Sequence, residues 1–287
     1  MCVRSVSGGH LAFILFLLSS PNPSFGADAP SARNLEEPPE LNDLPPLVEM
    51  GAATIGYISI EQRNGTGTLD DLSDKTSSWA LRGAASRDMG NDWNMQVDGH
   101  YGAAKAGLAK AQTKGGAAHV YYRRPSSHAF GGFVETSQLD AQLAELAGGG
   151  KTDANAILGG LEGAYFLEQA TLYGRAGAGK ALGGEKSAVQ IAAAAGARYY
   201  INDNLRLDFE GDFRRWQADG KTLDTFGAST VANYRLHDSP FAAFAGYRYE
   251  RTSSDTEPYR SHGLMAGFRY HFGSGSLKDA ERNGALW

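Results

Sequence analysis

The stretch Ser261–Phe272 reads S-H-G-L-M-A-G-F-R-Y-H-F. From Leu264 onward every second residue is apolar, and the intervening positions include Arg269 and His271. Because a β-strand points alternate side chains to opposite faces, this stretch predicts a strand with one apolar and one charged face. The apolar face ends in three aromatic residues, which is typical of a strand that crosses a membrane and ends at the lipid–water interface.

The same stretch resembles the C-terminal insertion signal of Gram-negative outer-membrane β-barrel proteins, in which a glycine is followed at fixed offsets by two aromatic residues. Those residues are Gly267, Tyr270 and Phe272 in this chain. Two features depart from the signal: the chain continues to Trp287, and Met265 stands where a polar residue is usual. The resemblance implies a small, porin-like barrel that is inserted by the barrel assembly machinery with periplasmic chaperones. It also implies contact with outer-membrane lipids and lipopolysaccharide.

The alternating pattern recurs along most of the chain. In 205–215, for example, Leu205, Leu207 and Phe209 share one face, and Arg206 and Asp208 lie on the other. The spacing predicts twelve strands, near residues 52–62, 76–88, 92–104, 115–124, 128–138, 154–167, 170–181, 187–201, 204–217, 222–236, 240–252 and 260–272. In the first of these segments two sets of apolar residues compete for the same face, so its facing stays open.

The connections between these segments differ in length along the chain. The second, fourth, sixth, eighth and tenth are tight, whereas 64–75, 105–114, 138–153 and 252–258 are long; the two remaining odd connections, 183–186 and 219–221, are short and break this contrast. Outer-membrane barrels have short periplasmic turns and long external loops, and an even strand count returns the chain to the periplasm. We therefore predict an all-β fold: a single antiparallel up-and-down transmembrane β-barrel of about twelve strands with both termini periplasmic. A soluble barrel or sandwich with its apolar face inside is the alternative.

The regions outside the barrel have their own signals. Leu11–Leu18 is a short apolar core after a basic start, which predicts a signal peptide over 1–26 with cleavage before Ala27. Residues 27–50 form a Pro-rich acidic periplasmic leader, 51–272 the barrel, and 273–287 a polar C-terminal tail in which Ser276 could cap a helical turn. The single cysteine, Cys2, leaves with the signal, and no basic run indicates nucleic-acid binding. The predicted location is the outer membrane of a Gram-negative bacterium.

If the apolar faces point to lipid, a large set of charged side chains points into the barrel. The candidates for lining the lumen are Arg82, Asp98, His119, Arg123, Glu162, Arg175, Arg198, Arg206, Asp208, Glu210, Asp212, Arg214, Arg235, Arg248, Glu250 and Arg269. Arginines are in excess, so a hydrated lumen would favour small polar or anionic solutes, as a porin-like channel does. The alternative is a structural or adhesive barrel whose interior is closed by salt bridges.

The longest connection contains an apolar spacing of three to four residues. Leu139, Leu143 and Leu146 would share one face of a helix, which Gly148 to Gly150 would end. Such a helix could fold inward as a constriction or cap the rim of the barrel.

Two groups of residues are candidates for metal sites. His100 and His119 lie equally far from the centre of the third connection and would be opposite each other in a symmetric hairpin. Asp70, Asp71 and Asp74 cluster in the first connection but match no EF-hand spacing. We expect neither group to hold a metal, and we expect no cofactor.

The sequence offers little support for catalysis. His237-Asp238-Ser239 contains two residue types of a hydrolase triad, but it lies in a predicted tight turn. No G-x-S-x-G elbow, phosphate-binding loop or zinc motif is present. We therefore expect no enzymatic activity, and an outer-membrane lipid hydrolase is the weakest of the three functional hypotheses.

Overall fold

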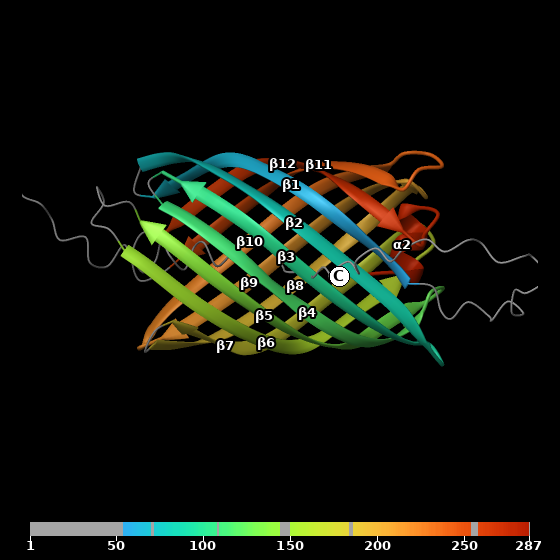
Figure 1. The fold of residues 1–287 in the computed structure, drawn as a ribbon, viewed down its shortest axis with the longest axis horizontal. Helices are drawn as coiled ribbons and strands as arrows, with labels where there is room; N and C mark the ends of the chain where they lie inside the picture. The colour runs from blue at the N-terminus through green and yellow to red at the C-terminus, as the bar shows by residue number, and fades with distance from the viewer. Residues whose placement is uncertain are drawn as a thin grey trace, which may run out of the picture.

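The computed structural model describes residues 54–69, 72–107, 109–143, 150–183, 186–253 and 258–286. Its strands form one closed antiparallel barrel in which each strand pairs with its neighbours in the chain and β1 pairs with β12 (Figure 1). The strands are β1 (Thr54–Leu69), β2 (Leu72–Gly90), β3 (Trp93–Ala106), β4 (Ala109–Arg124), β5 (His128–Leu143), β6 (Gly150–Phe166), β7 (Ala170–Gly183), β8 (Lys186–Asn202), β9 (Leu205–Ala218), β10 (Lys221–Arg235), β11 (Phe241–Ser253) and β12 (Tyr259–Phe272). The predicted twelve-stranded up-and-down barrel is confirmed.

The register fixes how the strands are staggered. Paired residues followed once around the ring return to β1 displaced by about 14 residues, which fits the roughly 35–45° tilt that barrel closure requires. The tilt is visible in Figure 1. Because the strands are tilted, residues that are paired in register do not lie at the same height along the barrel axis. Contacts across the interior therefore cannot be inferred from the pairing of neighbouring strands alone.

The outer face of the barrel is apolar. Leu161, Leu264 and Phe268 are 74%, 69% and 68% exposed, and each belongs to the outward set of its strand. Ile58 and Ile60 also point outward, whereas Ile55 is buried, which settles the facing of β1. This is the opposite of a soluble barrel, whose apolar face is inside, so the soluble alternative is excluded. Within the described ranges, no helix is long and apolar enough to cross a membrane.

Several predicted long connections are wrong in extent, because the strands continue through much of them. β1 and β2 remain paired as far as Leu69 and Leu72, and β3 and β4 as far as Ala106 and Ala109. These segments contain mostly polar and small residues on both faces. They therefore lack the alternation of apolar and polar residues that marks the lipid-facing parts of the strands, and the hydrophobic pattern did not predict them as strand.

The predicted helix at the fifth connection is wrong where the structure describes it. Residues 139–143 belong to β5, and the remaining residues, 144–149, lie outside the described ranges. Leu139 is fully buried and Ala141 nearly so, which is the every-second-residue pattern of a strand. Two leucines four residues apart fit both a helix and a strand, and here the paired neighbours β4 and β6 decide for the strand.

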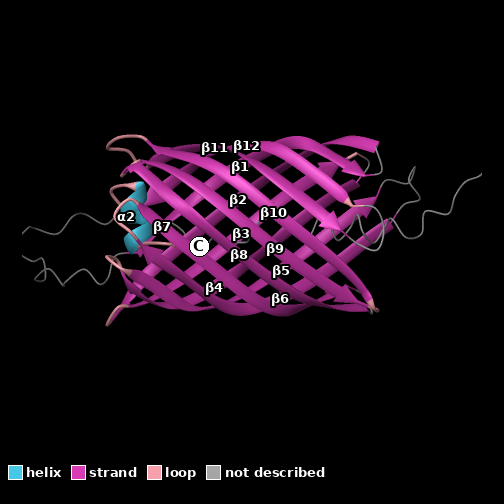
Figure 2. Ribbon diagram, turned by 180° about the vertical axis from the view of Figure 1, so that it is seen from behind, coloured by secondary structure: helices cyan, strands magenta, loops and turns pink. Residues whose placement is uncertain are grey.

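We name the two ends of the barrel by their connections. The turn end carries the start of β1, the end of β12 and the turns that follow β2, β4, β6, β8 and β10; the loop end carries the other connections. A short helix, α2 (Leu277–Asn283), lies at the turn end (Figure 2). Ser276 caps it by accepting a hydrogen bond from the Asp279 backbone amide, as predicted.

Candidate functional site: the barrel interior and its C-terminal plug

The sixteen predicted lumen residues occupy the inward positions of their strands. Eight of them are buried: Asp98, His119, Arg123, Glu162, Arg206, Arg235, Arg248 and Glu250. The others are partly buried: Arg82, Arg175, Arg198, Asp208, Glu210, Asp212, Arg214 and Arg269. Their part in lining a conducting lumen stays a prediction, because burial alone does not distinguish a narrow pore from a filled interior.

A histidine joins two carboxylates in the middle of the interior. His119 Nε2 lies 2.7 Å from Asp98 Oδ2, and His119 Nδ1 lies 2.9 Å from both oxygens of Glu162. The imidazole also stacks on Phe133 at 5.9 Å between ring centroids. His119 and His100 are not opposite each other, because the hairpin is not symmetric about the predicted centre: the register places Gln96 opposite His119 and Gly115 opposite His100.

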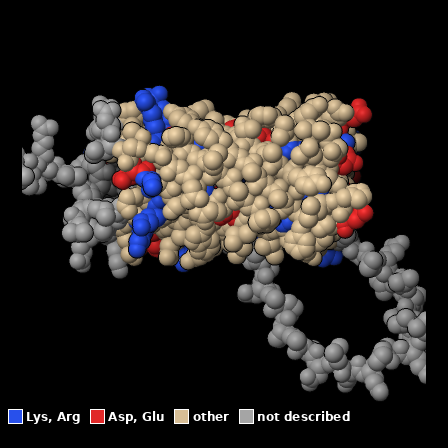
Figure 3. All heavy atoms as spheres, turned by 90° about the horizontal axis from the view of Figure 1, so that it is seen from above, with Lys and Arg blue, Asp and Glu red and all other residues tan. Residues whose placement is uncertain are grey.

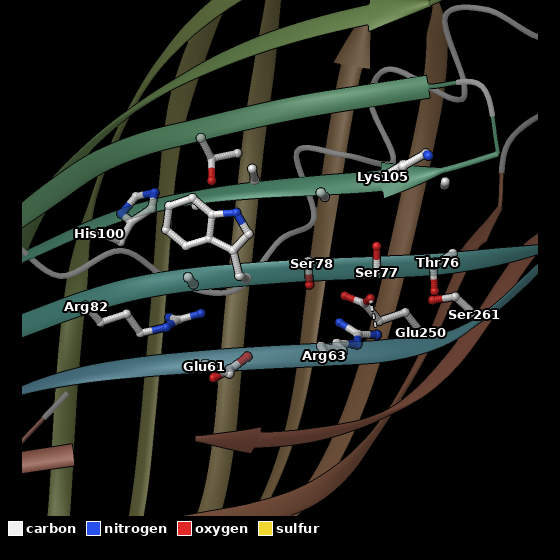
Figure 4. A pocket seen from close by; sticks show the side chains of 17 residues that line it. Glu61, Arg63, Thr76, Ser77, Ser78, Arg82, His100, Lys105, Glu250 and Ser261 are labelled. Carbon is white, nitrogen blue, oxygen red and sulfur yellow. Dashed lines mark hydrogen bonds and ion pairs between the residues drawn. The ribbon is translucent and has the colours of Figure 1, made fainter. Parts of the chain in front are cut away.

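Further ion pairs continue this network toward the loop end. Arg248 lies 2.9 Å from Asp212 and 3.2 Å from Glu250, and Arg63 lies 2.9 Å from the other oxygen of Glu250. Figure 4 shows Arg63 and Glu250 facing each other at the edge of a cavity of about 70 Å³. Nearer the turn end, both oxygens of Asp208 accept hydrogen bonds from Arg206 at 2.6 and 2.8 Å. Much of the interior charge is therefore neutralised by neighbours.

The C-terminal segment enters the barrel at the turn end, and we call residues 274–286 the plug. Glu281, on α2, is buried and accepts hydrogen bonds from Arg198 Nη1 at 2.6 Å, from Thr171 Oγ1 at 3.1 Å and from the hydroxyl of Tyr200. Leu277 is buried against Tyr200 and Ala242. The helix is thus attached to the barrel wall by one carboxylate and one apolar side chain.

The chain after α2 is held through its backbone. The Leu286 amide donates to Gln96 Oε1 and its carbonyl accepts from Arg198 Nη1, both at 2.8 Å. The Gly284 carbonyl accepts a hydrogen bond from Arg123 Nη2. The side chain of Leu286 is buried in a cluster that includes Tyr121 and Phe166. Interior side chains of strands on several sides of the ring therefore converge on the plug.

Two further arginines fasten the plug at its edges. Arg282 donates to the carbonyls of Pro125 and Leu167 in two of the turns, and Arg235 donates to the Ser274 carbonyl at 2.7 Å. Residues 274–286 of the predicted tail therefore occupy the turn end of the interior.

The charge state of Glu281 follows from its surroundings. Burial alone would raise the pKa of this carboxyl, but the charges of Arg198 and Arg206 and the hydrogen bond from Tyr200 hold it below its usual value. Glu281 is therefore ionised at neutral pH. Arg198, Tyr200 and Thr171 together form a site that binds a carboxylate.

Comparison with known proteins supports the fold. No protein-family model matches the chain, and no curated protein matches its sequence. The translocator domain of the autotransporter NalP from Neisseria meningitidis is similar in structure, with a TM-score of 0.53 and 14% identity over 79% of this chain and 91% of that one. The β-domain of the Bordetella autotransporter BrkA has a TM-score of 0.49 and 12% identity over 76% of this chain and 100% of that one. The toluene transporter TodX of Pseudomonas putida has a TM-score of 0.45 and 10% identity over 76% and 89%.

The chain has the fold of an outer-membrane β-barrel. The closed barrel, its exposed apolar outer face and its likeness to the translocator domain agree with the outer membrane of a Gram-negative bacterium as its location. The signal peptide over 1–26 and the leader over 27–50 lie outside the described residues, as do Asp70 and Asp71. The periplasmic placement of both termini stays a prediction.

The remaining candidates of the outer-membrane barrel are placed as follows. His237 lies 3.1 Å from Asp238 in an exposed turn, while Ser239 Oγ accepts a hydrogen bond from the Phe241 amide, so no triad is assembled there. Among the described residues no group of three or more His, Cys, Asp or Glu side chains could hold a metal ion. Gly267 packs tightly against β1 and the Phe244 ring, but its part in an insertion signal stays a prediction.

Three important interior residues are not among the candidates that the sequence predicts. Arg63 lies just beyond the predicted end of the first strand at residue 62, although it continues the inward set of β1. Glu281 and Leu286 lie in the tail, where one helical turn gives no information on where the segment docks. The excess of arginines in the predicted interior implies that they need further carboxylate partners. This need was the one indication in the sequence that Glu281, an acidic residue of the tail, could enter the barrel.

Proposed function

We propose that this protein is a narrow outer-membrane channel for small polar or anionic solutes, gated by its own C-terminal plug. The carboxylate of Glu281 carries the proposal, because it occupies a site made by Arg198, Tyr200 and Thr171. When the plug leaves, this site is free to accept the carboxylate or phosphate group of a solute. The plug then competes directly with the transported anion.

The way the plug is attached supports a reversible closure. Most of its contacts are hydrogen bonds and ion pairs to backbone carbonyls and one carboxylate, and water can replace such contacts at moderate cost. Within residues 274–286, Leu277 and Leu286 are the buried apolar anchors. A plug held mainly by polar contacts exchanges between docked and free states more readily than an apolar core does.

The proposal is tested by current through planar bilayers. The full-length protein should conduct little, and a variant lacking residues 274–287 should conduct readily and prefer anions. Replacing Arg206, Arg214 and Arg248 by Ser in that variant should reduce the anion preference. Correctly folded barrels that stay silent without the plug would contradict the channel, and unchanged selectivity would remove these arginines from the conduction path.

A second candidate is a structural or adhesive barrel that stays closed. The interior ion pairs of Arg248 with Asp212 and Glu250, and of His119 with two carboxylates, favour it, because paired charges fill space that a pore would need. The same bilayer measurement separates the two functions, since this candidate predicts no current with or without the plug. Neither proposal assigns the barrel a catalytic role, and lipid turnover by the purified protein would overturn both.

A further inference from the structure

The outer face of the barrel carries a groove near the loop end of β1 to β4. It encloses about 230 Å³, several times the roughly 30 Å³ that one water molecule occupies in the liquid. Its lining includes Trp79, Ala103, Gln62, Gln112, Lys105 and Lys110, which all belong to the outward sets of their strands. These outward positions place the groove on the outer face of the barrel.

The two lysines of this groove are register partners. Lys105 on β3 lies directly opposite Lys110 on β4, and both are exposed. Directly opposed residues have Cβ atoms about 5 Å apart, and like charges in such a pair repel each other. Neither lysine forms an ion pair with any residue that the structure describes.

A second pair of like charges lies on the same side of the barrel. Arg251 on β11 is directly opposite Arg260 on β12, and both are exposed. Between the two pairs lie only β1 and β2, since β12 neighbours β1 in the closed sheet. By strand alternation, no described outward residue in the loop-end half of these six strands is a carboxylate.

On the opposite side of the barrel, the loop end carries an outward cation that is paired with a carboxylate. Arg215 on β9 is directly opposite Asp224 on β10, and the two side chains form paired hydrogen bonds of 2.7 Å. Lys and Arg gather at the loop end in Figure 3, whereas Asp and Glu are prominent at the turn end. Lys105, Lys110, Arg251 and Arg260 thus lie on one side of the loop end and, among the described residues, lack the neutralising partner that Arg215 has.

The groove also lies at the right depth for a lipid headgroup. Trp79 packs on Tyr101, with ring centroids 5.5 Å apart, and both side chains are partly exposed beside the apolar band. Aromatic residues mark the interface between hydrocarbon and headgroups, and basic residues just beyond them attract anionic lipid. Lys105 lies at the loop-end tip of its strand (Figure 4).

We propose that this groove binds the phosphorylated sugar headgroup of a glycolipid in the leaflet that surrounds the loop end. Lys105 and Lys110 bind one phosphate between them, the amides of Gln62 and Gln112 bind sugar hydroxyls, and Trp79 packs on the sugar ring. Arg251 and Arg260 form a second phosphate contact. The proposal does not depend on the channel function, because it concerns only the outer face of the barrel.

Binding of lipid A to the full-length protein in zwitterionic detergent tests the proposal. Bisphosphorylated lipid A should bind and raise the temperature at which the barrel unfolds, and monophosphorylated lipid A should bind more weakly. Inorganic phosphate at the same concentration should have no effect. An equal effect of inorganic phosphate would show a simple anion site and overturn the glycolipid assignment.

Variants locate the site. Lys105→Ser combined with Lys110→Ser should weaken lipid A binding roughly tenfold to thirtyfold, since two basic contacts to phosphate are lost. Trp79→Ala should weaken it less and reduce the difference between lipid A and phosphate. The matched control is Arg215→Ser, which removes an exposed cation at the same end that is already paired with Asp224, and its binding should be unchanged. Equal losses in the control and the double variant would indicate non-specific attraction and overturn the proposal.

Discussion

The two ends of the barrel handle their charged side chains in opposite ways. At the turn end, Arg123, Arg198 and Arg235 point inward and are bound by carbonyls and a carboxylate of the chain's own C-terminal segment. At the loop end, Lys105, Lys110 and their counterparts on β11 and β12 point outward and meet other cations. The three turn-end arginines are bound by groups of the same chain, whereas the four outward cations at the loop end have no described carboxylate partner.

This difference separates two ways of using a positive charge. A buried arginine must be neutralised, because an unpaired charge away from water is very costly. An exposed lysine remains hydrated, so a pair of opposed lysines lowers the stability of the barrel only slightly. Such a pair can therefore be retained where it binds an anion. The turn end is therefore where substitutions should have large effects on stability, and the loop end is where they should change binding with little effect on stability.

The largest expected effect comes from Glu281→Ala. Removing one partner of a buried ion pair costs about 3–5 kcal/mol, and Arg198 would be left facing an empty site. The plug should then spend much of its time undocked. Trypsin should cleave after Lys278 and Arg282 faster than in the unaltered protein, which mass spectrometry of the intact chain measures.

Asn283→Ala is the matched control for this experiment. Asn283 lies on the same helix, but it is exposed, and its side chain donates a hydrogen bond to Asp279 Oδ1 at 2.8 Å rather than to the barrel wall. Its cleavage rate should stay near that of the unaltered protein. Equal rates for Glu281→Ala and the unaltered protein would mean that the carboxylate does not hold the plug.

The next effect concerns the middle of the interior. His119→Leu removes the imidazole that lies between Asp98 and Glu162, so both buried carboxylates lose their contact with it. We expect the free energy of unfolding to fall by about 3 kcal/mol or more, measured by urea titration of the folded barrel in bilayers. His237→Leu, in an exposed turn, should change it by less than about 0.5 kcal/mol. Similar small changes in both variants would contradict a role of the His119 network in stability.

The dependence of plug docking on pH should be smaller and has a definite sign. The pKa of Glu281 is lowered in the docked state, so docking gains from its ionisation above the usual glutamate pKa of about 4.3. That contribution is lost as the pH falls through the lowered pKa of the docked state. Conductance should therefore rise only in acid, below the ordinary glutamate range. Glu281→Gln should remove this acid transition, and an acid transition that persists in the variant belongs to other groups.

The sequence was sufficient for the barrel and for the facing of its side chains. Alternation in segments such as 205–215 assigned Arg206 and Asp208 to the inside once the apolar face was taken to point to lipid. It was not sufficient for contacts across the interior, because the pairing of Arg63 with Glu250 depends on the stagger of the whole barrel. Nor could it place Glu281, because a seven-residue helix carries too little pattern to show what it packs against.

The lysine pair at the loop end should have the smallest effect on stability. Lys110→Glu turns the repulsive pair with Lys105 into an attractive one, and the gain in stability in zwitterionic detergent should be at most about 1 kcal/mol. Arg215→Glu does the reverse, since it places a carboxylate opposite Asp224, and it should cost a similar amount. Added bisphosphorylated lipid A should stabilise the unaltered protein and Arg215→Glu, but not Lys110→Glu. Thermal unfolding with and without the lipid measures all three proteins. If lipid A stabilised Lys110→Glu as much as the unaltered protein, the opposed lysines would have no role in binding. The two ends of the barrel would then differ only in how deeply their charged side chains are buried.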